Sequence, residues 1–124
     1  MNRKIDLGKI LEFQRRFTKE RKWEKYHTPK NLAMALSVEA SELMEHFQWL
    51  TAKEAKAIMK NPAKAREVSN ELADILYYLV RLADMLRVDL EEAFWEKTKE
   101  NAAKYPVKLA KGNMKKYTEY KRKN

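Results

Sequence analysis

The chain has 124 residues, no cysteine, and 27 Lys or Arg residues against 18 Asp or Glu residues. This length predicts a single domain with a real core, and the lack of cysteine excludes disulfides, thiol nucleophiles and thiolate metal sites. Only two glycines and three prolines interrupt a sequence rich in helix-forming residues, which predicts an all-α protein. Because no segment has the length of a signal-peptide core or a membrane span, we expect a cytoplasmic protein without a membrane partner.

The positive charge lies mainly at the C-terminal end. Of the formal net charge of +9, residues 104–124 carry +7, from eight Lys or Arg and one Glu. A basic end of this kind can bind RNA or the phosphates of a small ligand, although most basic tails are simply solvated. We therefore predict a helical domain at 1–106 and a basic tail at 107–124, and we do not expect a nucleic-acid partner.

Apolar spacing and capping residues predict four to five helices in chain order. Thr51 and Glu54 form a capping box for the short third helix, and Pro62 suits the first turn of the fourth. A bundle this short, with apolar stripes left over, is expected to complete its core as a dimer or a dimer of dimers. The expected helices cover residues 6–23, 29–50, 51–61, 62–87 and 89–105.

Carboxylates enter the apolar stripes of two of these helices. Glu39, Glu42 and Glu45 recur every three residues on the second helix. The fourth helix carries Glu71 and Asp74 at the same spacing. Two helices packed through these stripes would bring the carboxylates towards one point, where like charges force protonation or recruit a hard cation. Mg²⁺ prefers such oxygen ligands and keeps waters for a phosphate substrate.

Spacing alone leaves a second interpretation open at each of these positions. Acidic residues three and four apart are ordinary on solvated helices, where nearby basic residues such as Arg66 and Arg81 can pair with them. Gln14 can be a buried amide satisfied by a neighbouring helix. The aromatic residues fill a core or interface, or offer faces for stacking on a nucleobase. These aromatic residues are Trp23, Trp49 and Tyr78.

An ordered series of sequence blocks resembles one known family. The blocks are W-E-K-Y-H-T-P-K-N-L from Trp23, E-A-S-E-L-M-E-H-F-Q-W from Glu39, E-L-A-D-I-L-Y-Y-L from Glu71, V-D-L-E-E-A from Val88 and K-T-K-E-N-A-A-K-Y-P from Lys97. Together they resemble the all-α nucleoside triphosphate pyrophosphohydrolases of the MazG superfamily, and most of all their dCTP pyrophosphatase branch. The resemblance covers nearly the whole chain. It implies a MazG-like tetramer with nucleotide pockets at the subunit contacts.

The resemblance also implies roles for individual residues. Mg²⁺, with Mn²⁺ able to substitute, is expected at Glu39, Glu42, Glu71 and Asp74. Apart from the resemblance, the position of Glu39 in the apolar stripe should raise its proton affinity, so Glu39 is the first candidate for the general base among the expected catalytic residues, with Glu42 and Glu45 as alternatives. The base is expected to meet Trp23, Trp49, Tyr78 and Gln14, and the phosphates are expected to meet Lys30, Asn31, Lys97, Asn101 and Tyr105.

Gln14 departs from the pattern of the dCTP branch, because relatives there can carry a histidine that bonds to the base. An amide can still donate and accept, but its reach differs from that of an imidazole, so strict cytosine preference does not follow. The expected reaction is hydrolysis of a (deoxy)nucleoside triphosphate, dCTP or a related or modified nucleotide, to the monophosphate and pyrophosphate. The alternatives are a non-catalytic nucleotide- or RNA-binding module that uses the basic tail and tryptophans, and a purely structural helical oligomer.

Overall fold

The computed structural model describes residues 4–120, and within that range every regular element is helical, as the sequence predicts. The α-helices are α1 (Leu7–Glu20), α2 (Pro29–Glu45), α3 (Ala52–Lys56), α4 (Pro62–Leu86), α5 (Leu90–Lys104) and α6 (Val107–Ala110). Short 3₁₀ turns lie at Glu24–Tyr26, Ile58–Lys60 and Tyr117–Glu119. No helix among the described residues is both long enough and apolar enough to cross a membrane.

Side-chain caps mark the starts of α3 and α4. The Thr51 hydroxyl accepts from the backbone N–H of Glu54, whose carboxylate accepts from the N–H of Thr51, which is the predicted capping box. The Asn61 side chain accepts from two N–H groups at the start of α4, and Pro62 occupies its first turn. The long helix therefore begins at a residue that the sequence identifies.

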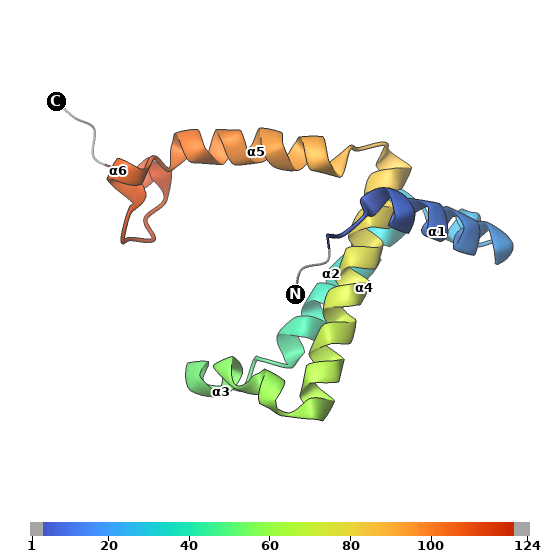
Figure 1. Ribbon diagram of the computed structural model, residues 1–124, viewed down its shortest axis with the longest axis horizontal. Helices are drawn as coiled ribbons and strands as arrows, with labels where there is room; N and C mark the ends of the chain where they lie inside the picture. Colours follow the sequence, from blue (N-terminus) through green and yellow to red (C-terminus); the bar gives the residue numbers. More distant parts are fainter. Residues whose placement is uncertain (1–3, 121–124) are drawn as a thin grey trace. The chain divides into compact units, whose positions relative to one another are not determined.

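Helices α2 and α4 form the centre of the first unit and run side by side over much of their length (Figure 1). The buried apolar residues of these two helices are Leu32 from α2 and Val68, Val80 and Ala83 from α4. Helix α1 packs against α4 as well. This pairing fixes one face of α2 against one face of α4, and the acidic residues lie on these two helices.

Helix α2 ends earlier than its apolar spacing predicts. The helix stops at Glu45 instead of Leu50, because the chain tightens into i→i−3 turns: the N–H groups of His46 and Phe47 donate to the carbonyls of Leu43 and Met44. The expected continuation to Leu50 is therefore wrong. Trp49 lies beyond the helix and is 86% exposed.

The chain divides into two compact units between Val88 and Asp89. In the second unit the Tyr105 ring packs edge-to-face against Tyr117 and Tyr120, so part of the expected tail is folded. The division into a domain at 1–106 and a tail at 107–124 stays a prediction. The last basic residues of that tail, Lys121, Arg122 and Lys123, lie outside the described residues.

Candidate metal centre and nucleotide site

Three of the predicted carboxylates come together between α2 and α4. Glu39, Glu42 and Glu71 each offer one oxygen, and these three atoms lie within 4.8 Å of one another. Oε2 of Glu39 and Oε2 of Glu71 are buried and have no hydrogen-bond partner. Buried carboxylate oxygens without partners are costly, so the arrangement can hold a metal ion that would satisfy them.

The electrostatics of Glu39 show how closely the acidic groups crowd. Its pKa is raised from 4.5 to about 7, first by burial, then by hydrogen bonding of its protonated form to Glu71 and Glu42, and then by the charges of Glu42 and Asp74. Burial, followed by the charges of the same carboxylates, also raises the pKa of Tyr78. Asp74 and Tyr78 therefore border the cluster, although Asp74 is not one of its three converging groups.

His46 adds a nitrogen to the edge of the cluster. Its Nε2 lies 3.8 Å from Oε1 of Glu71, and its Nδ1 lies 3.5 Å from Oε2 of Glu67. Glu42 lies one turn before His46, and this spacing is the signal that links the imidazole to the acidic face. Glu45 is exposed at the end of α2 and does not join the three converging carboxylates.

The other predicted site residues lie in several parts of the chain. Trp23 packs against Phe17 and His27, with ring centroids 5.8 and 6.2 Å away. Lys30 is exposed, and the Asn31 side chain donates to the Tyr26 carbonyl at 3.1 Å. The remaining three, Lys97, Asn101 and Tyr105, belong to the second unit, where Lys97 pairs with Glu100.

Gln14 is fully buried and its amide has a fixed orientation. Its Nε2 donates to the carbonyl of Tyr77 at 2.9 Å, while its Oε1 has no partner. A cavity of about 530 Å³ between α1 and α4 is lined by Gln14 among mostly apolar neighbours. Trp23, Trp49 and Tyr78, the three predicted base platforms, do not line this cavity.

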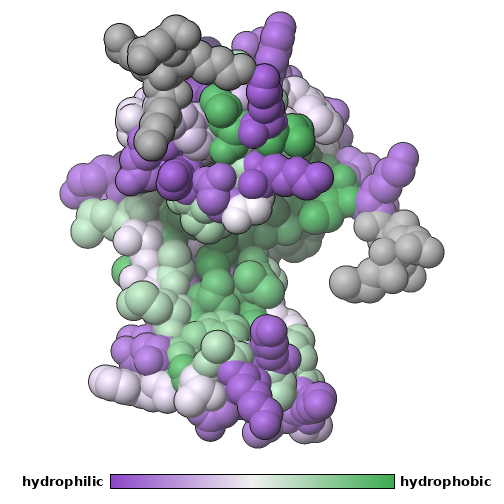
Figure 2. Space-filling model, turned by 90° about the vertical axis from the view of Figure 1, so that its left-hand side faces the viewer, coloured by the Kyte–Doolittle hydropathy of each residue, from purple (hydrophilic) through white to green (hydrophobic). Residues whose placement is uncertain are grey.

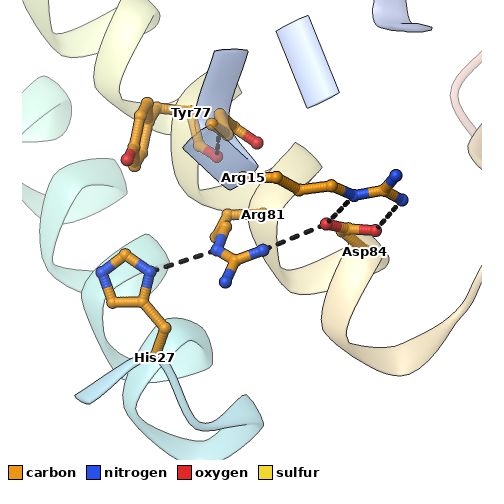
Figure 3. Close-up of polar contacts among 6 residues, drawn as sticks. Arg15, His27, Tyr77, Arg81 and Asp84 are labelled. Carbon is orange, nitrogen blue, oxygen red and sulfur yellow. Dashed lines mark hydrogen bonds and ion pairs between the residues drawn. The ribbon is translucent and has the colours of Figure 1, made fainter. Parts of the chain in front are cut away.

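A charged network next to this region was not predicted as part of the site (Figure 3). Asp84 accepts from Arg15 and Arg81, and Nε of Arg81 donates to Nδ1 of His27 at 3.1 Å. The sequence predicts Arg81 only as a partner for the acidic helix faces, but in the structure it pairs with Asp84, one turn further along α4. The available sequence signal was the i,i+3 spacing of Arg81 and Asp84.

Comparison with known proteins shows the family to which the chain belongs. The model of the MazG-like family matches residues 34–120. The chain is 42% identical over 113 residues to dCTP pyrophosphatase 1 of Bos taurus and of Homo sapiens, which covers 91% of this chain and 67% and 66% of those proteins. It thus spans about two thirds of their length.

A solved structure is also similar. The crystal structure of a pyrophosphatase from Archaeoglobus fulgidus superposes with a TM-score of 0.76 at 37% identity, and the match covers 86% of this chain and 97% of that one. Both the sequence and the fold are therefore shared, and this chain belongs to the MazG-like family.

Proposed function

We propose that this protein hydrolyses dCTP or a related nucleoside triphosphate between the α- and β-phosphates, using a divalent cation held by Glu39, Glu42, Glu71 and Asp74. Its relatives support the class: it is a nucleotide pyrophosphohydrolase. The observation that carries the proposed site is the convergence of three carboxylates, two of which have a buried oxygen without a partner.

The donor set favours Mg²⁺ over softer metals. All the converging ligands are carboxylate oxygens, which hard cations prefer, and Mn²⁺ is the natural substitute. Bound there, the cation would neutralise charge on the phosphates and orient the attacking water.

Glu39 is the proposed general base. Without a cation, burial and the neighbouring carboxylates raise the pKa of this carboxyl group from 4.5 to about 7, so its affinity for a proton exceeds that of an ordinary carboxylate, although a bound cation would reduce it. Glu42 and Glu45 are the alternatives, and Glu45 is the weaker one because it lies outside the converging group.

The fixed amide of Gln14 supports a proposal about the base. One of the two N–H groups on its Nε2 donates to the Tyr77 carbonyl, which orients the amide, and its acceptor Oε1 has no partner and is the group proposed to contact the base. An acceptor selects a donor, such as the exocyclic amino group of cytosine or adenine, and penalises a carbonyl. Trp23, Trp49 and Tyr78 remain the proposed stacking partners for the base, and Lys30, Asn31, Lys97, Asn101 and Tyr105 the proposed phosphate contacts.

We also propose a homo-oligomer in the cytoplasm. Leu72, Leu79 and Leu86 recur every seven residues along α4 and are all exposed, and Figure 2 shows apolar side chains open to solvent. A stripe of this period fits a helix of another copy. A dimer or a dimer of dimers would bury it.

One assay tests the reaction. Purified protein with Mg²⁺ is incubated with a panel of canonical and modified nucleoside triphosphates, and the products are separated by chromatography. We expect monophosphate and pyrophosphate in equal amounts, and no turnover in EDTA. Release of orthophosphate instead, or turnover unaffected by EDTA, would contradict the proposal.

A further inference from the structure

Arg81 carries a charge into the interior of the first unit. The residue is 4% exposed, and its guanidinium has two described partners, Nδ1 of His27 and Oδ2 of Asp84. A buried ion pair rarely adds stability beyond what apolar residues of the same size would give. The directions of these hydrogen bonds are therefore the more informative feature.

The first bond determines the protonation of His27. Because Nε of Arg81 donates to Nδ1, that nitrogen must carry a lone pair, and the single proton of the neutral ring lies on Nε2. Burial and then the charge of Arg81 both lower the pKa of His27. The ring is thus held neutral, in one tautomer.

The second bond connects His27 to α1 as well as to α4. Asp84 accepts from Nη1 of Arg81 at 3.0 Å and from Nε of Arg15 at 3.0 Å, with a further bond to Nη2 of Arg15 at 2.6 Å (Figure 3). One carboxylate faces two guanidinium groups, so the network keeps a surplus positive charge beside His27. The sum equals the charge of Arg81 alone, and this positive charge opposes protonation of the ring.

His27 lies in the segment that carries several proposed nucleotide contacts. Its backbone N–H donates to the carbonyls of Trp23 and Glu24, and its ring packs beside the Trp23 indole. Four residues later, the Asn31 side chain donates back to the Tyr26 carbonyl. The bond from Arg81 joins this segment, residues 23–31, to α4, the helix that carries Glu71 and Asp74.

We infer that Arg81 is a positioning residue for nucleotide binding, which holds His27 as the neutral Nε2–H tautomer and thereby fixes the segment 23–31 against α4. This inference rests on the proposed function, because the segment matters through Trp23, Lys30 and Asn31. Arg81 lies ten residues after Glu71, about 15 Å along the helix axis at 1.5 Å per residue. It therefore acts on binding, and the chemical step at the carboxylates is unchanged.

The first test is spectroscopic and needs no substrate. The chain has two histidines, so long-range ¹H–¹⁵N spectra of the imidazoles are simple, and an H27L variant assigns them. We expect His27 of the wild type to show an unprotonated Nδ1 and a protonated Nε2. In R81M the ring should become a mixture of tautomers with a higher pKa. An unchanged spectrum in R81M would overturn the inference.

The second test measures nucleotide affinity by calorimetry with α,β-methylene dCTP and Mg²⁺. We expect R81M and H27L to bind about tenfold more weakly, the effect of one charged hydrogen bond. The matched control is R66M, the same substitution at an exposed site of α4, which should bind like wild type. In H27N the side-chain oxygen takes the place of Nδ1 as acceptor, so affinity should recover to near the wild-type value.

The outcomes separate the inference from the proposed reaction. Wild-type affinity in R81M, or an H27N variant as weak as H27L, would overturn the positioning role. Thermal unfolding of each variant shows that the binding data come from folded protein, and should R81M not fold, the pair H27L and H27N decides. A wild type that binds the analogue but releases no pyrophosphate from dCTP overturns the reaction alone, and one that does not bind overturns both.

Discussion

Glu39 on α2 and Glu71 on α4 face each other, each with its Oε2 buried and without a hydrogen-bond partner. Together with Glu42 they place three carboxylate oxygens within 4.8 Å. Neutralising Glu71 without changing its size should therefore abolish turnover. We expect E71Q to lose at least about 100-fold in kcat with unchanged helicity, measured by pyrophosphate release and circular dichroism.

The matched control for that variant is E67Q, one turn earlier on α4. Glu67 is exposed and lies outside the three converging carboxylates, so its loss should leave turnover near the wild-type level. If E67Q and E71Q lose activity to the same degree, the site does not lie where the three oxygens meet.

Without a bound cation, the stability of the protein should depend on the protonation of Glu39. Its folded pKa of about 7 exceeds the ordinary 4.5, so its contribution to stability is complete below pH 4.5 and disappears as pH rises through 7. In EDTA, the melting temperature should fall from pH 6 to pH 8 by more in the wild type than in E39Q. Mg²⁺ should raise the wild-type melting temperature more at pH 8, because it favours the carboxylate form.

Asp84 should give the opposite dependence at acid pH. Hydrogen bonds from Arg15 come first among the causes that hold its pKa below the ordinary 3.8. Its stabilisation is therefore complete above pH 3.8 and is lost as pH falls further. D84N should lower the free energy of unfolding by about 1–3 kcal/mol at pH 7, measured in urea, because it leaves Arg81 poorly paired. A gap between variant and wild type that stays constant down to pH 2 would contradict this account.

Base selection should depend on the orientation of the Gln14 amide. Its Oε1 has no partner and can accept a hydrogen bond from the base. The substitution Q14L should therefore lower kcat/KM for dCTP more than kcat/KM for dTTP. We expect the ratio of kcat/KM for dCTP over dTTP to fall by about tenfold, the effect of one hydrogen bond. An unchanged ratio would show that the base does not reach this oxygen.

Association of copies should depend on the leucine stripe of α4. L79E introduces a charge in the middle of the exposed series Leu72, Leu79 and Leu86, and it should shift the mass measured by light scattering towards the monomer. The control is K64E, a charge change at the exposed start of the same helix. A monomeric wild type would exclude the proposed oligomer directly.

The sequence alone determined most of the fold. Thr51 and Asp89 mark helix starts through local chemistry, because a capping side chain bonds to N–H groups only two or three residues away, and Pro62 suits a first turn. Helical spacing likewise placed Glu39, Glu42 and Glu71 on facing stripes. The end of α2 could not be located this way, because the apolar pattern continues to Leu50 while the backbone changes to i→i−3 bonds.

Tertiary structure decided which side chains meet and in which state. No spacing rule links His27 to Arg81, 54 residues away, or Gln14 to the Tyr77 carbonyl, because these contacts depend on how α1 and the segment 23–31 pack on α4. Packing also decided which carboxylates converge: Glu71 joined Glu39, while Glu45 stayed in solvent. Helices can be predicted from the sequence because their start signals lie within a few residues of one another. The burial and protonation state of a side chain cannot be predicted in this way, because they depend on distant segments that exclude water from it.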